Sequence, residues 1–186
     1  MEYNDTQYEK DRKVYGYLAS LPIVIALVHL AGFIALQSLI SYDAATQSFS
    51  GTGALGVVFS FSSFSAILAS ASENIGLIKA LPAVISIVEG LMLMFLSSQA
   101  VKGKHLMVSI SFYLYLADTI VLIPTIILSL LHSYPLAMSV TDIIVSVLIH
   151  ALLLAAFIYL YIISERLKKF ETVSKEENSG ESVYRK

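Results

Sequence analysis

Four long apolar stretches dominate the pattern of hydrophobic and polar positions along the chain. Short polar or charged segments separate most of them, and only isolated ionisable residues interrupt them. The stretches cover residues 14–42, 80–101, 106–131 and 136–164. Because an α-helix rises about 1.5 Å per residue, each stretch can cross a hydrocarbon core about 30 Å thick. The pattern predicts an all-α polytopic membrane protein whose domain, residues 14–164, is a bundle of four transmembrane helices.

A further apolar segment, residues 54–72, lies between the first and second of these stretches. It is uncharged and rich in serine, and three glycines lie just before it or near its start. Crossing the membrane here would place the basic C-terminal tail on the opposite side from the other basic clusters, against the positive-inside rule. We therefore expect an external or re-entrant helix that lies on the bundle, and a fifth span is the alternative. Non-helical backbone at this depth would need burial against protein or water.

Composition supports the membrane assignment and excludes several chemistries. Of the 186 residues, 56% are hydrophobic and 14% are charged, whereas a soluble domain is about a quarter charged. The absence of cysteine excludes disulfides, thiolate metal sites and cysteine nucleophiles. We find no nucleophile turn, phosphate-binding loop or nucleic-acid signature, so the sequence gives no support for an enzyme. The expected partners are the lipid bilayer and either other membrane subunits or a second copy of the chain, with no nucleic acid.

Lysine and arginine predict how the chain is oriented. They cluster before the first span, between the second and third spans, and after the fourth span. Four spans with both termini in the cytoplasm place every cluster inside, which predicts a multi-pass protein of the cell membrane. Residues 1–13 would then be a cytoplasmic N-terminal segment. Residues 165–186 would be a cytoplasmic tail, which its charged, Ser/Glu/Lys-rich composition predicts to be disordered.

Four ionisable residues lie near the centres of the four predicted spans: His29, Glu89, Asp118 and His150. Counting from either end of its span, each is reached after roughly 10 to 15 residues, or about 15 to 22 Å of helix. A charged group at the bilayer centre costs at least about 2.5 to 3.5 kcal/mol, so such groups usually face inward and pair. We expect the four side chains to form one polar layer at mid-depth.

Helical spacing places further polar residues beside this layer. Ser111 and Tyr115 share a face with Asp118 on the third span, where polar positions recur every three or four residues. On the fourth span, Asp142, Ser146 and His150 step by four, so Ser146 can reach His150 one turn away. Asp142 is also suited to the start of the fourth helix, where the helix dipole stabilises a carboxylate.

Two imidazoles and two carboxylates allow several functions. A titratable chain, with Asp142 as an outer station, would handle protons, ions or small solutes, and is the interpretation we favour. A divalent transition metal held by all four side chains is a second hypothesis, which would make the protein a metal-dependent intramembrane enzyme. Haem is disfavoured because the sequence lacks a set of several paired histidines. The remaining alternative is a structural or accessory subunit in which the layer only pins helices together.

The C-terminal half also resembles a known group of proteins. "KGKHLMVSISFYLYLADTIVLI", followed by a short turn and a span with a central histidine, is similar to uncharacterised small prokaryotic integral membrane proteins with four helices. The matching positions are Gly103, Tyr115, Asp118 and His150. The resemblance implies a four-helix membrane fold and brings no known activity.

Overall fold

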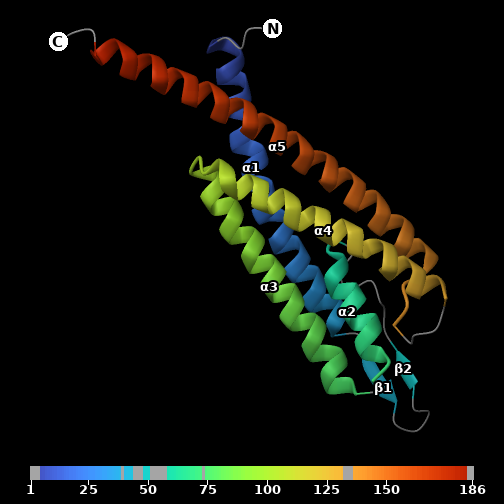
Figure 1. Ribbon diagram of the computed structural model, residues 1–186. Helices are drawn as coiled ribbons and strands as arrows, with labels where there is room; N and C mark the ends of the chain where they lie inside the picture. The colour runs from blue at the N-terminus through green and yellow to red at the C-terminus, as the bar shows by residue number, and fades with distance from the viewer. Residues whose placement is uncertain are drawn as a thin grey trace.

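The computed structural model describes residues 5–38, 40–43, 48–50, 58–72, 74–131 and 136–183 (Figure 1). Within these residues the chain forms five helices and one two-stranded hairpin. In chain order the elements are α1 (Asp5–Gln37), β1 (Ser41–Asp43), β2 (Ser48–Ser50), α2 (Ser60–Ser70), α3 (Ile75–Val101), α4 (His105–Leu130) and α5 (Val140–Val183). The antiparallel hairpin pairs Ser41 with Ser50 and was not predicted from the sequence.

Four helices, α1, α3, α4 and α5, are long and apolar enough to cross a membrane, which confirms the predicted all-α fold with four spans. The spanning segments are Thr6–Ala35, Ile75–Val101, His105–Leu130 and Val140–Ser174. Large apolar side chains remain exposed on all four helices, among them Ile34, Phe95, Ile123 and Leu152. Apolar surface this extensive is unsuited to water and marks a membrane-facing exterior. The chain is therefore a multi-pass membrane protein.

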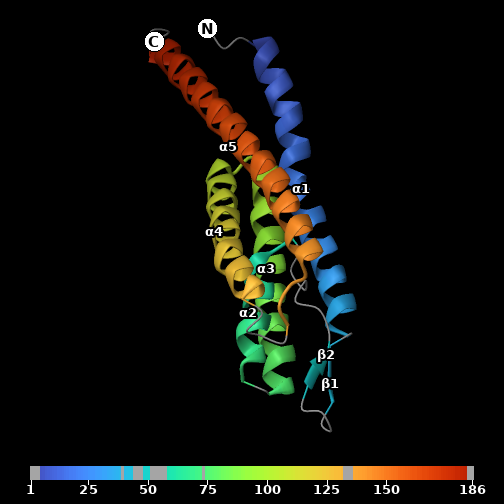
Figure 2. The same cartoon turned by 90° about the vertical axis from the view of Figure 1, so that its right-hand side faces the viewer.

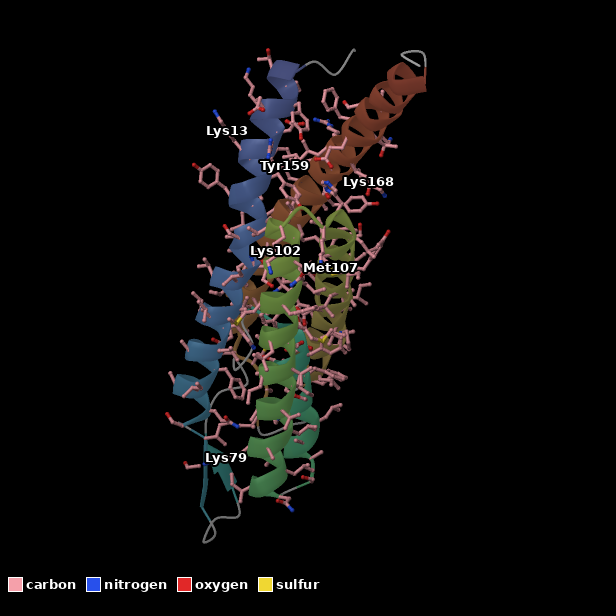
Figure 3. All side chains as sticks on the ribbon, turned by 90° about the vertical axis from the view of Figure 1, so that its left-hand side faces the viewer. Lys13, Lys79, Lys102, Met107, Tyr159 and Lys168 are labelled. Carbon is pink, nitrogen blue, oxygen red and sulfur yellow. The ribbon has the colours of Figure 1, made fainter. Side chains whose placement is uncertain are left out.

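The two termini lie at the same end of the molecule, and the β-hairpin lies at the other (Figures 1 and 2). Figure 3 shows Lys13, Lys102 and Lys168 toward the end with the termini and Lys79 at the opposite end. The basic clusters of three separate helices thus gather at one end, which we call the basic end. Which side of the membrane this end faces stays a prediction.

Residues 58–72 contain a short helix that enters the bundle instead of crossing it. Helix α2 has 11 residues, about half the length that a span needs. It packs against α3 and α4 (Figure 1), and eight of its residues are buried. The hydroxyl groups of Ser65 and Ser70, for example, donate hydrogen bonds to main-chain carbonyl oxygens of their own helix. The described part of the segment is therefore too short to be a fifth span, and whether it is external or re-entrant stays a prediction. Residues 54–57 of the predicted segment lie outside the described residues.

The prediction of a disordered tail from residue 165 is wrong for its described part, because α5 continues as a helix to Val183. Contacts with the start of α1 support the extension. Tyr8 stacks on Phe170 with 4.7 Å between ring centroids, and its hydroxyl donates to Glu171 at 3.3 Å. Glu165 and Lys168, three residues apart, add an ion pair at 4.0 Å. Composition alone predicts disorder here, because it carries no information about the contacts that α1 makes with this segment.

The other span boundaries differ from the prediction by a few residues. Helix α1 begins at Asp5, well before residue 14, and ends at Gln37, so Tyr42 falls in β1. The polar N-terminal segment is helical because it continues the first span without a break. The tight turn between α3 and α4 depends on Gly103, whose φ of 80° lies in the left-handed region that favours glycine.

Candidate functional site

Asp118 of α4 caps the N-terminus of α2 inside the bundle. Its Oδ1 atom accepts hydrogen bonds from the main-chain N–H groups of Ser60 at 2.7 Å and Phe61 at 3.0 Å. The first N–H groups of a helix have no partner within the helix, and Phe59, at the N-cap position, offers no side-chain acceptor. A carboxylate from another helix supplies that acceptor and also meets the positive end of the helix dipole. This contact lets α2 begin inside the bundle.

His150 of α5 lies on the other side of the same carboxyl group. Its Nδ1 atom is 2.7 Å from the carbonyl oxygen of Ser146, and its Nε2 atom is 3.1 Å from Oδ2 of Asp118. The Ser60 hydroxyl is 2.8 Å from the same Nε2 atom. Asp118 and His150 are 2% and 1% exposed, so α2, α4 and α5 meet in one buried polar cluster. We call Ser60, Asp118 and His150 the capping triad.

The geometry of the triad limits where its hydrogens can lie. A carbonyl oxygen only accepts, so His150 Nδ1 donates a hydrogen to Ser146. Nε2 lies within hydrogen-bond distance of both Oδ2 of Asp118, at 3.1 Å, and the Ser60 hydroxyl, at 2.8 Å. A proton between Nε2 and Oδ2 gives imidazolium with carboxylate or imidazole with carboxylic acid, and without that proton the Ser60 hydroxyl can donate to Nε2.

Glu89 of α3 approaches the triad through a second set of α2 contacts. Its Oε2 atom accepts from the Ser62 hydroxyl at 3.1 Å, and that hydroxyl lies 2.6 Å from the hydroxyl of Ser86. Glu89 and Asp118 also line one small cavity of about 10 Å³, which corresponds to room for roughly one water molecule. The two carboxyl groups therefore border one small space, whose other lining residues are aromatic or aliphatic.

Aromatic rings close the site on the side of Tyr115. This ring stacks on His150 and Phe157, with centroid distances of 5.9 and 4.8 Å, and meets the edge of Phe59 at 6.0 Å. Its hydroxyl donates to the carbonyl oxygen of Val58 at 3.5 Å. The stack keeps the imidazole ring in one orientation and excludes water from that side of the triad.

His29 does not join the polar layer that the sequence predicts. Its side chain is 3% exposed, and its Nε2 atom has no hydrogen-bond partner among the described residues. The ring meets Phe59 in a T-shaped contact at 4.5 Å, and Phe59 in turn meets Tyr115. His29 thus lies in an apolar environment, and Phe59 contacts both its ring and that of Tyr115.

The four-residue metal site proposed from His29, Glu89, Asp118 and His150 does not form. Among the described residues no three His, Asp or Glu side chains are placed to hold a metal ion together. The physical reason is that Asp118 Oδ1 is already occupied by the N–H groups of α2, while the His29 ring packs on Phe59. A helix N-terminus occupies the place where a cation would be expected beside the carboxylate.

The three other residues that the sequence places beside the polar layer lie in different surroundings. Ser146 accepts from His150 through its carbonyl oxygen, with its hydroxyl 3.4 Å from the same nitrogen. Ser111 donates to the carbonyl oxygen of Met107 in its own helix. Asp142 exchanges hydrogen bonds with Ser139 at the start of α5. Asp142 therefore caps a helix, as its position in the sequence also suggested, and does not contact the triad.

Sequence reasoning missed the contribution of α2. Ser60 and Ser62, together with the main-chain N–H groups of Ser60 and Phe61, complete the site. The available signal was the run "SFSSFS", whose serines recur at the spacing of a helix in an otherwise apolar segment.

Comparison of the chain with protein-family models, with curated proteins and with solved structures finds no match. The resemblance to small prokaryotic membrane proteins therefore stays a prediction, and the argument for a function depends on the site alone.

Proposed function

We propose that this membrane protein binds and releases a proton at the Asp118–His150 pair and couples that event to the seating of α2. The observation that carries the proposal is the contact between His150 Nε2 and Asp118 Oδ2 at 3.1 Å, across which one proton can be shared. The other oxygen of the same carboxyl group holds the N-terminus of α2. Proton binding and the position of α2 therefore both depend on the Asp118 side chain.

Changing the number of protons would strain the pair. Removing the shared proton places lone pairs opposite each other, and adding a second places two hydrogens opposite each other. A second proton also converts the ionised acceptor of α2 into a neutral one, and hydrogen bonds to ionised groups are about twice as strong as neutral ones. The second proton therefore weakens the hold on Ser60 and Phe61, so α2 moves more easily when the pair is doubly protonated.

Glu89 supports a route by which protons reach the pair. It is only partly buried, whereas Asp118 is almost fully buried, and the two groups border the same small cavity. The Ser62 hydroxyl donates to Glu89 and lies beside the hydroxyl of Ser86. In this scheme Glu89 exchanges protons with the outside of the bundle and a water in the cavity passes them to Asp118.

A flux assay tests this proposal. Purified protein is reconstituted into liposomes that contain a pH-sensitive dye, and a membrane potential is imposed. We expect proton entry with the unaltered protein, a loss of at least about tenfold in Asp118→Asn, and a slower flux in Glu89→Gln. Asp142→Asn is the matched control, because it makes the same chemical change in a carboxyl group that only caps α5; its flux should be unchanged.

A structural role without proton movement is the second candidate, and one observation favours it. Asp118 Oδ1 has two main-chain partners on α2, which would by itself explain a carboxyl group at this depth. A structural or accessory subunit would show no proton flux, and Asp118→Asn would alter only its stability or its association with other membrane proteins. The flux assay therefore separates the two functions.

A further inference from the structure

A larger cavity lies at the basic end of the bundle, away from the capping triad. Its volume is about 380 Å³, within the range of ligand pockets. Helices α1 and α5, the end of α3 and the α3–α4 turn enclose it. Its polar and charged lining comes from Arg12, Tyr15, Lys102, His105 and Glu171. We call it the basic-end cavity.

Two cations of this cavity, Arg12 and Lys102, form no ion pair with any of the described residues. The acid in the lining, Glu171, is already engaged, since it accepts from the Tyr8 hydroxyl at 3.3 Å and lies 3.5 Å from His105 Nε2. The cavity therefore presents unpaired positive charge and favours an anion.

Two glycines line the cavity. A Cβ atom added at Gly16 or at Gly103 would meet no other atom within 4 Å, so both positions border empty space. Helix α4 begins beside this space with His105, and its N-cap residue, Lys104, makes no side-chain capping hydrogen bond. The positive end of the α4 dipole adds to the charge of the two cations.

The position of the cavity favours a lipid over a soluble anion. Arg12 comes two residues before the first apolar stretch, and Lys102 directly follows the second, so both side chains belong at the level of lipid headgroups. Gly16, Val101 and Leu167 give the lining an apolar part, and Val101 is half exposed. An amphipathic ligand satisfies both parts of the lining.

We propose that the basic-end cavity binds the phosphate group of an anionic phospholipid, with Arg12 and Lys102 as its cationic contacts. Arginine and lysine are the side chains that bind phosphate in proteins. The acyl chains would leave the cavity past Val101 along the apolar surface of α3. This site is independent of the proton function proposed above, because none of its residues contacts the capping triad.

Native mass spectrometry of the protein in detergent tests the site. Phosphatidylglycerol is titrated against phosphatidylcholine with the same acyl chains, and inorganic phosphate serves as the soluble competitor. The test variant is Arg12→Gln with Lys102→Gln. Its matched control is Lys13→Gln with Lys104→Gln, which removes the same charge from the same two segments at exposed positions outside the lining. Gly16→Leu fills the cavity and leaves every charge in place.

We expect phosphatidylglycerol to bind the unaltered protein at least about tenfold more tightly than phosphatidylcholine. A basic residue near a membrane surface contributes about fivefold to the binding of anionic lipid, so the test variant should lose roughly 10- to 30-fold and the control less than threefold. Gly16→Leu should lose at least about fivefold. Equal losses in test and control variants, or unchanged binding in Gly16→Leu, would overturn the proposal. Displacement of the lipid by millimolar inorganic phosphate would assign the cavity to a soluble anion instead and overturn it as well.

Discussion

Replacing Asp118 tests how the polar layer holds the fold together. In Asp118→Leu the two N–H groups at the start of α2 lose their acceptor, although the number and branching of the side-chain heavy atoms are retained. In Asp118→Asn the amide oxygen can still accept from Ser60 and Phe61, while the amide nitrogen can donate to His150 Nε2. The asparagine thus imitates a carboxyl group that permanently carries the shared proton. Helix α2 should therefore lose its fixed position in the bundle in the leucine variant and keep it in the asparagine variant.

The size of the loss follows from two hydrogen bonds of 2.7 and 3.0 Å. A hydrogen bond to an ionised group contributes about 1.5 to 3 kcal/mol, and a neutral one about 0.5 to 1.5 kcal/mol. Hydrogen bonds within membrane proteins average only about 0.6 kcal/mol, because the unfolded chain also finds partners there. For Asp118→Leu we therefore expect a loss of about 2 to 5 kcal/mol in the free energy of unfolding. Asp118→Asn should lose about 1 kcal/mol.

Two measurements check this prediction. Unfolding in mixed micelles by increasing fractions of a denaturing detergent gives the free energy, and hydrogen–deuterium exchange of the α2 peptides reports whether the helix stays seated. Ile120→Leu, at an exposed apolar position two residues away on α4, is the control and should change stability by less than about 0.5 kcal/mol. A leucine variant as stable as this control, with unchanged exchange in α2, would refute the capping role of Asp118.

Three further substitutions test other parts of the structure. His29→Phe should leave stability unchanged or raise it by about 1 kcal/mol, because it removes a buried nitrogen without a partner; a clear loss in the same unfolding assay would mean that the imidazole has a partner. Gly90→Leu should cost about 1 to 3 kcal/mol, since even a Cβ atom there would lie 3.0 Å from the Leu30 side chain, and Leu30→Ala should restore part of the loss in a double-variant cycle. Gly103→Ala should cost about 1 to 2 kcal/mol, because φ at this residue is 80°; a thermal unfolding midpoint equal to that of the unaltered protein would contradict it.

The four spans could be predicted because hydrocarbon thickness sets their length and apolar side chains set their composition. The depth of the ionisable groups could also be counted along each helix. Depth does not specify which way a side chain points, however. Asp118 and His150 were expected at one level and do meet, whereas His29 packs beside Phe59 and its Nε2 atom has no hydrogen-bond partner among the described residues.

The role of α2 could not be predicted because its decisive contacts join residues far apart in the sequence. Ser60 and Asp118 are separated by 58 positions, and Ser60 and His150 by 90. The acceptor for α2 is contributed by a helix that no local pattern links to it. The sequence could therefore propose a re-entrant segment and a buried carboxylate separately, but not that one caps the other.

The most direct test of the account is the protonation state of His150 in lipid bilayers. Solid-state nitrogen NMR of histidine-labelled protein can follow both ring nitrogens over a range of pH, with the His150 signals assigned by their loss in His150→Gln. We predict that Nδ1 stays protonated throughout, that Nε2 changes its protonation with pH, and that this change disappears in Asp118→Asn, where Nε2 stays unprotonated. A ring that keeps one protonation state at every pH, or an unprotonated Nδ1 atom, would contradict the account.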